Sequence, residues 1–218
     1  MEIINFADTP SLLSGYMAEL RDTVVQRDRL RFRANLKRIG QIMAYEISKR
    51  LAYSKANIQT PLGVAPCDIL SEKIVLATIL RAGLPLHEGF LSYLDRAENA
   101  FVSAYRKYKE KGNEFFIHIE YIASPSIEGK TLIIVDPMLA TGSSMELAYQ
   151  ALLTKGKPAK LHIASVIASQ QAVDFVKSNF PDNTTLWLGV VDPELNPHSY
   201  IVPGLGDAGD LAFGEKQS

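Results

Sequence analysis

The stretch TLIIVDPMLATGSS, residues 131–144, decides the fold of this chain. It begins with five apolar or β-branched residues, which indicate a buried strand. The acidic residue Asp136 follows, and small and hydroxyl-bearing residues then lead into a helical pattern over residues 145–153. A buried strand joined by a short loop to a helix is the repeating unit of parallel sheets covered by helices. Such a loop can also direct backbone N–H groups, hydroxyls and the positive end of a helix at a phosphate group.

Apolar strand patterns and helical patterns alternate along the rest of the chain. This alternation predicts an α/β fold, with a mostly parallel sheet that has helices on both faces. In such sheets, ligands bind at the carboxyl ends of the strands. The expected strands are residues 74–80, 100–105, 115–122 (one arm of a β-hairpin), 131–135, 161–167 and 186–191, and the expected helices of this part are 86–94, 145–153 and 172–179.

A long amphipathic helix is predicted before the first of these strands, over residues 22–53. Its apolar residues recur at steps of three and four, which places them on one face. No internal repeat or low-complexity tract interrupts the chain, so residues 1–218 are expected to form a single domain. The residues of the apolar face are Phe32, Leu36, Ile39, Met43, Ile47 and Leu51.

The composition is that of a soluble globular protein, with 47% hydrophobic and 22% charged residues. A net charge of -1 gives no general attraction for nucleic acid, so none is expected as a partner. The N-terminus does not resemble a signal peptide, and the apolar runs are too short to cross a membrane. A lone cysteine, Cys67, forms no internal disulfide and suits a reducing compartment. We therefore expect a cytoplasmic protein that has no membrane partner.

The loop after residue 135 allows two interpretations. It could hold a phosphate, or it could be an ordinary strand that ends in a helix capped by Thr or Ser. It is not a nucleotide P-loop, because no Gly-Lys-Ser/Thr follows the required spacer, and it lacks the G-x-G-x-x-G pattern of dinucleotide sites. From the loop alone, both interpretations stay open.

Two further segments carry candidate binding residues. In ILRAGLP, residues 79–85, Arg81 follows a predicted strand beside small residues, so its planar guanidinium could meet a phosphate. In YIVPGLGDAGDLAFG, residues 200–214, three glycines allow the main chain to approach a ligand closely around Asp207. The latter segment could also be a flexible acidic tail, but its apolar residues argue against a tail, and it lacks the ligand spacing of a calcium loop.

These segments resemble known motifs. Residues 131–144 resemble the phosphoribosyl pyrophosphate motif of type I phosphoribosyltransferases, and residues 79–85 resemble the pyrophosphate loop of that family. Residues 200–214 closely resemble the uracil-binding signature of uracil phosphoribosyltransferases. Together with an N-terminal helical arm at about 16–53, the similarity covers most of residues 16–214. The resemblance implies a glycosyltransferase of pyrimidine salvage, which converts uracil and phosphoribosyl pyrophosphate to uridine monophosphate and pyrophosphate.

The resemblance also implies a role for each matching residue. Asp136 would hold the ribose hydroxyls, residues 140–144 the 5-phosphate, and Arg81 and Arg106 the pyrophosphate that leaves. Asp207 would either assist loss of the uracil N1 proton or contact the metal through water. The expected catalytic residues are Asp207, Arg81 and Arg106; the expected phosphoribosyl pyrophosphate site adds Asp136, Pro137, Met138, Leu139, Ala140, Thr141, Gly142, Ser143 and Ser144; and the expected uracil site is Ile201, Gly206, Asp207 and Ala208.

One position departs from the family pattern. Ser143 stands where the family usually has a second glycine. If that position requires a positive φ, serine costs about 1 kcal/mol or more. If it does not, the serine hydroxyl adds a donor for the phosphate.

The resemblance further implies Mg²⁺ as the cofactor, which would arrive with the pyrophosphate, and a homodimer or higher homo-oligomer. Two alternatives stay open at this point: a phosphoribosyltransferase for another base such as a purine, and a non-catalytic nucleotide-sensing regulator on the same fold. The histidines, which are dispersed, are interpreted as structural: His87, His118, His162 and His198.

Overall fold

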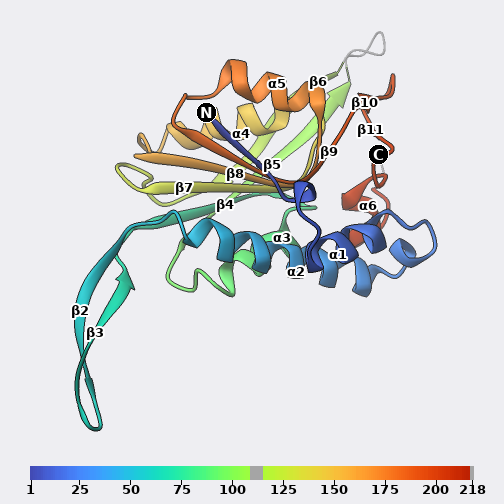
Figure 1. Cartoon of the computed structure of the whole chain (residues 1–218). Coiled ribbons are helices and arrows are strands. Elements are labelled where there is room, and N and C mark those ends of the chain that lie inside the picture. Colours follow the sequence, from blue (N-terminus) through green and yellow to red (C-terminus); the bar gives the residue numbers. More distant parts are fainter. Residues whose placement is uncertain (109–114, 217–218) are drawn as a thin grey trace.

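The computed structural model describes residues 1–108 and 115–216, and the side chains among them except those of 104–108 and 115–120. Its centre is a sheet of seven strands, which includes the N-terminal strand and strands from the rest of the chain (Figure 1). The strands of the sheet are β1 (Glu2–Asn5), β4 (Ile74–Leu80), β5 (Glu98–Tyr108), β6 (Phe115–Ala123), β7 (Thr131–Leu139), β8 (Lys160–Ser169) and β9 (Thr184–Asp192).

The strand order is β1-β9-β8-β7-β4-β5-β6. Neighbouring strands run parallel, except that β6 runs antiparallel to β5. The expected α/β fold with a mostly parallel sheet is confirmed, and so is the expected hairpin arm at residues 115–122, because β6 pairs with β5. The residues that would join these two strands, 109–114, lie outside the described part of the chain.

Helices cover both faces of the sheet, as predicted (Figure 1). The strands supply both layers of the core because alternate residues point to opposite faces. In β4, for example, Leu76 packs in the cluster on one face and Val75 in the cluster on the other. The first face carries α1 (Leu12–Arg21), α2 (Arg29–Ser48) and α3 (Leu84–Leu91), and the second carries α4 (Ser143–Leu153) and α5 (Gln170–Asn179).

Helices α2 and α3 meet at two glycines. A Cβ atom on Gly40 would lie 2.5 Å from the carbonyl oxygen of Leu86, and a Cβ on Gly89 would lie 2.2 Å from the carbonyl oxygen of Lys37. Both distances are far below van der Waals contact, so only glycine at each position lets the two helix backbones approach this closely.

The predicted helix over residues 22–53 is wrong at both ends. A separate helix, α1, precedes it, a short 3-10 turn (Val25–Arg27) follows, and α2 then begins after Asp28. The Asp28 carboxylate accepts from the backbone N–H groups of Leu30 and Arg31, which fixes the helix start. The predicted apolar face is confirmed, because its six residues are all buried.

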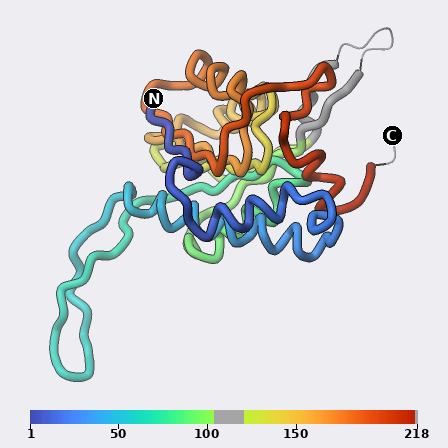
Figure 2. Tube along the Cα trace, turned by 45° about the vertical axis from the view of Figure 1, so that its right-hand side comes forward, coloured from blue at the N-terminus to red at the C-terminus, as the bar shows by residue number. Residues whose placement is uncertain are grey.

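The C-terminal end of that prediction failed because a hairpin begins there. Among the residues that the structure describes, strands β2 (Tyr53–Thr60) and β3 (Gly63–Leu70) pair only with each other, and they extend away from the sheet and its helices (Figures 1 and 2). The sequence analysis did not predict this hairpin. No helix among the described residues is long and apolar enough to cross a membrane.

Strand β7 is longer than predicted. It continues to Leu139, so Asp136 and the three residues after it belong to the strand and not to a loop. The other predicted elements lie within three residues of the observed ends. The C-terminal segment forms the short strands β10 (Glu194–Leu195) and β11 (Ile201–Val202), which pair with each other, and the helix α6 (Ala208–Phe213).

Candidate active site

A cavity of about 240 Å³ lies at the carboxyl ends of β4 and β7, where ligands bind in sheets of this type. Three segments that are far apart in the sequence meet there: the end of β4, the end of β7 with the start of α4, and the start of α6. Six of the predicted site residues line it, namely Arg81, Asp136, Met138, Ser144, Asp207 and Ala208.

Other predicted site residues in the described part of the chain do not line the cavity. Leu139 packs into the core on the far side of the sheet, because β7 alternates, and Pro137 is buried. Ile201 is buried in the core under the cavity and Gly206 is exposed. The side chain of Arg106 lies outside the described residues.

The loop between β7 and α4 is shaped for an anion. Gly142 has φ +85°, and no side chain caps α4 there. The first N–H groups of a helix have no acceptor within the helix; that of Ser143 donates weakly to the Thr141 hydroxyl over 3.4 Å, and the others and the positive helix end can meet a phosphate. Thr141 and Ser143 add hydroxyls, whose oxygen atoms lie 3.2 Å apart. Ser143 has no positive φ, so the relaxed alternative for this serine is the one observed.

Arg81 is held at the edge of the cavity by the C-terminal segment. Its Nη2 atom donates to Oδ1 of Asp210 over 3.2 Å and to the carbonyl oxygen of Gly214 over 3.3 Å. Its Nε atom is buried and has no partner among the described residues. The peptide bond between Leu80 and Arg81 is cis. The guanidinium therefore retains an unused donor beside the cavity.

Asp136 belongs to strand β7 and lines the cavity. Burial raises the pKa of its carboxyl group to about 7, and a hydrogen bond from the backbone of Met138 opposes this only in part. The carboxyl group of Asp136 is therefore harder to ionise than an ordinary aspartate.

The segment that follows β11 brings its main chain to the cavity. Gly204 and Gly206 have φ values of +66° and +90°, which glycine adopts without strain. Asp207 caps α6, because its Oδ1 atom accepts from the N–H of Asp210 over 3.0 Å. The N–H of Ala208 points to the sulfur of Met138 over 3.4 Å, which joins this segment to β7.

Comparison with known proteins identifies the family. The model of the uracil phosphoribosyltransferase family matches residues 8–215. The chain belongs to the uracil phosphoribosyltransferase family. A uracil phosphoribosyltransferase of Porphyromonas gingivalis is 63% identical over 216 residues, which cover 99% of this chain and 100% of that protein. The family and the transferase activity predicted from the sequence are thereby confirmed.

Solved structures show the same fold. A protein from Aquifex aeolicus superimposes with a TM-score of 0.85 at 30% identity, over 97% of this chain and 98% of that one. A hypoxanthine phosphoribosyltransferase from Staphylococcus aureus superimposes with a TM-score of 0.50 at 16% identity, over 73% of this chain and 74% of that one. The second likeness concerns the fold, which is that of type I phosphoribosyltransferases.

The sequence analysis of this uracil phosphoribosyltransferase family member did not name six residues that line the cavity: Ile79, Leu80, Ala82, Gly209, Asp210 and Lys216. Asp210 lines the cavity and pairs with Arg81, but it was not among the predicted site residues. Its position three residues after Asp207, at the start of a short helix, was the available signal. Two of the histidines, His87 and His162, are buried and do not line the cavity, in agreement with a structural role.

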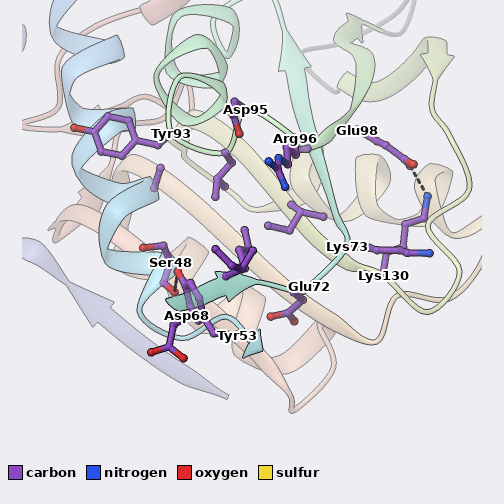
Figure 3. Close-up of a pocket in the computed structure, with 16 residues that line it drawn as sticks. Ser48, Tyr53, Asp68, Glu72, Lys73, Tyr93, Asp95, Arg96, Glu98 and Lys130 are labelled. Carbon is purple, nitrogen blue, oxygen red and sulfur yellow. Dashed lines mark hydrogen bonds and ion pairs between the residues drawn. The ribbon is translucent and has the colours of Figure 1, made fainter. Parts of the chain in front are cut away.

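A second, larger cavity of about 670 Å³ lies at the amino ends of the strands, where the β2–β3 hairpin leaves the body (Figure 3). Tyr53 and Asp68 reach it from the hairpin, while Lys73 precedes β4. Lys130 pairs there with Glu98 (Figure 3). No residue predicted for the active site lies in this cavity.

Proposed function

We propose that the 240 Å³ cavity is where uracil is joined to the activated ribose of phosphoribosyl pyrophosphate, with uridine monophosphate and pyrophosphate as products. The observation that carries this proposal is the meeting of Arg81, Asp136 and Asp207 from three separate segments at one cavity. An arginine, a half-buried carboxyl and a glycine-rich main chain suit a pyrophosphate, ribose hydroxyls and a planar base, respectively.

The chemistry needs positioning and charge stabilisation more than a protein nucleophile. The bond from ribose C1 to pyrophosphate breaks while uracil N1 attacks C1, so positive character develops at C1 and negative charge on the leaving group. Arg81 and Arg106 stabilise that negative charge, and Asp136 orients the ribose hydroxyls. The loop of residues 140–144, at the N-terminus of α4, holds the 5-phosphate.

The main chain of residues 206–208 reads the edge of uracil, with Ile201 packed beneath. The exposed carboxylate of Asp207 either accepts the N1 proton or contacts the cation that accompanies pyrophosphate. Its Oδ1 atom caps α6, so Oδ2 is the oxygen that has no partner among the described residues.

The residues present fit magnesium that arrives with the substrate. The cavity lining includes the carboxylates of Asp136, Asp207 and Asp210, which are oxygen ligands of the type that Mg²⁺ prefers. The described residues hold no group of three or more His, Cys, Asp or Glu that could bind a metal unaided. When bound with the pyrophosphate, Mg²⁺ would neutralise part of its charge, and Asp207 would hold it directly or through water.

A product assay tests this proposal. The protein is incubated with uracil, phosphoribosyl pyrophosphate and Mg²⁺, and uridine monophosphate and pyrophosphate are quantified. Formation of both in equal amounts is the expected result. Arg81→Ala should reduce the rate constant at limiting phosphoribosyl pyrophosphate by about 100-fold or more, because a charged donor to the leaving group is lost. Binding of nucleotides without turnover would instead favour the non-catalytic regulator.

We also propose that the protein forms a homodimer through the β2–β3 hairpin. Residues 56–67 of this hairpin carry no charge, and exposed apolar side chains lie on it, among them Ile58, Leu62 and Val64. An isolated two-stranded hairpin is marginal in water, so an apolar one that extends from the body requires a partner. A second copy that packed on it would also cover the larger cavity at its base (Figure 3).

Sedimentation of the full chain tests the dimer. The wild type should sediment as a dimer or larger, and Leu62→Asp combined with Val64→Lys should shift it toward monomer because the apolar contact is replaced by buried charge. Lys55→Gln, at an exposed ion pair near the hairpin base, is the control. A wild type that stays monomeric at high concentration would refute the proposal.

We expect the whole chain, residues 1–218, to act as one domain, since α1, α2 and the C-terminal segment share one core cluster. We expect it to act in the cytoplasm, because Cys67 is a free thiol, which suits a reducing compartment.

A further inference from the structure

We propose that Arg21 and Asp192 position the uracil-binding segment and so set the affinity for the base; the inference rests on the proposed function of that segment. Arg21 is the last residue of α1 and Asp192 the last residue of β9, far from each other in the sequence. Neither residue lines the cavity, and neither was predicted as a site residue.

The two side chains form a bidentate ion pair. Nη2 of Arg21 donates to Oδ1 of Asp192 over 2.7 Å, and Nη1 donates to Oδ2 over 3.0 Å. The pair is largely buried, since 23% of the arginine side chain and 6% of the aspartate side chain are exposed. Parallel two-point contact fixes the relative orientation of both groups, which a single contact does not.

The same pair holds the main chain of Gly204 on both sides. Oδ2 of Asp192 accepts from the N–H of Gly204 over 2.8 Å, and Nη1 of Arg21 donates to the carbonyl oxygen of Gly204 over 3.3 Å. Both polar groups of one residue are therefore bound to one ion pair. A Cβ on Gly204 would lie 2.0 Å from the carbonyl oxygen of Ile201, so only glycine fits at this turn.

The ion pair of Arg21 and Asp192 with the main chain of Gly204, called the clamp below, lies directly before the residues that bind the base. Gly206, Asp207 and Ala208 begin two residues after Gly204, and the far end of their segment is tied by a contact from Arg33 to the carbonyl oxygen of Ala212, over 2.7 Å. Hydrogen bonds to a base edge depend steeply on position, and a displacement of about 1 Å can cost about 100-fold. A fixed Gly204 therefore keeps the donors and acceptors of residues 206–208 aligned before uracil arrives.

The chain contains a matched control for this clamp. Arg31 and Glu19 form another bidentate pair, with both contacts at 2.7 Å, and also link α1 to its surroundings. Within the described part of the chain, that pair has no hydrogen bond or ion pair with the C-terminal segment. A substitution there removes an ion pair of the same chemistry without touching Gly204.

The test compares Arg21→Met, Arg21→Lys and Asp192→Asn with Arg31→Met by steady-state kinetics. The KM for uracil should rise about tenfold or more in Arg21→Met and Asp192→Asn, and less in Arg21→Lys, which keeps one contact. The KM for phosphoribosyl pyrophosphate should change less than about threefold, and Arg31→Met should change neither KM more than about twofold. Equal increases of both KM values in the clamp variants, or a uracil KM within about twofold of the wild type, would overturn the inference.

Hydrogen exchange of the ligand-free protein separates this inference from the proposed function. Arg21→Met should raise amide exchange at residues 204–209 while exchange in α2 stays unchanged. Unchanged exchange at 204–209 would overturn the positioning role whatever the enzyme does, whereas a wild type that fails to use uracil would refute the proposed function alone. If Arg21→Met does not fold, Arg21→Lys is judged by the same two measurements.

Discussion

Nη2 of Arg81 lies 3.2 Å from Oδ1 of Asp210, so α6 and the turn after β4 are joined by an ion pair at the edge of the cavity. Each side chain is 37% exposed, and the pair occupies donors that a pyrophosphate would need. An anion that binds Arg81 through Nη2 must therefore compete with Asp210 for that donor group.

Replacing Asp210 by Asn should strengthen the binding of pyrophosphate. An exposed ion pair contributes about 1 kcal/mol or less, so the gain should be at most about fivefold. Calorimetric titration at low and high salt checks this, because the gain should shrink as salt screens the charges. Asp174→Asn, in the exposed pair with Lys177 on α5, is the control. Weaker binding in Asp210→Asn would mean that Asp210 holds the ligand or its cation.

The loop before α4 should respond unequally to changes at two adjacent residues. A Cβ on Gly142 would lie 2.5 Å from a ring carbon of Phe175, and the backbone there has φ +85°. We expect Gly142→Ala to destabilise the fold by about 2–3 kcal/mol and to weaken phosphoribosyl pyrophosphate binding about tenfold or more. Thermal unfolding with ligand titration measures both.

Ser143→Gly should do far less. Ser143 has ordinary backbone angles, so glycine only adds freedom to the loop, at a cost of about 0.5–1 kcal/mol. Substrate affinity should fall a few-fold at most. A loss of more than about 100-fold would mean that the serine side chain itself is essential, since loop ordering does not account for so large an effect.

Asp136 should make stability depend on pH. Its pKa is raised in the folded state to about 7 from the ordinary aspartate value of 3.8, so the folded protein holds this proton more tightly than the unfolded chain. The stability that it contributes is present below pH about 4 and is lost as the pH rises to about 7. Asp136→Asn should therefore gain stability relative to the wild type over that range, by at most about 4 kcal/mol.

Urea unfolding of both proteins at pH 5 and pH 8 measures this difference. The kcat/KM for phosphoribosyl pyrophosphate should fall at least about tenfold in the same variant, because an amide cannot replace a carboxylate toward two hydroxyls. An activity equal to that of the wild type would remove Asp136 from the site, and a pH-independent stability difference would contradict its raised pKa.

The base specificity should follow from hydrogen bonds between the edge of the base and the main chain of residues 206–208. Cytosine offers an amino donor where uracil offers a carbonyl acceptor, and a buried donor that faces a donor costs about 1–3 kcal/mol. The kcat/KM for cytosine should therefore be lower than that for uracil by about tenfold or more, as initial rates with each base would show. Comparable turnover of cytosine would refute the base assignment.

The sequence was sufficient for six of the seven strands of the sheet and for half of the cavity lining, and it did not predict the edge strand β1. Strand β4 was predicted at its observed ends, since an apolar run that stops at Arg81 leaves little choice. The boundaries of α2 failed because the periodic pattern continues past the Asp28 cap and past Ser48, where the β2–β3 hairpin begins. Most residues of the β2–β3 hairpin are exposed, so its sequence lacks the regular alternation of apolar and polar residues that predicts a half-buried strand.

The contacts that the sequence could not supply join distant segments. Asp192 and Arg21 are separated by 171 residues, and each is by itself an ordinary charged residue at the end of an element. The role of Asp210 likewise depends on Arg81, which only the fold brings near. The raised pKa of Asp136 follows from the burial of the end of β7, and the sequence predicted a loop there.

The close approach of α2 and α3 at Gly40 and Gly89 couples the position of Arg81 to a helix contact outside the cavity. Helix α3 continues directly from the turn that carries Arg81, so the spacing between α2 and α3 also sets where that guanidinium stands. A methyl group at residue 89 would meet the backbone of α2 at 2.2 Å, and α3 would have to move away as a rigid rod. Gly89→Ala should therefore weaken the binding of pyrophosphate by displacing Arg81, although it changes no residue that lines the cavity.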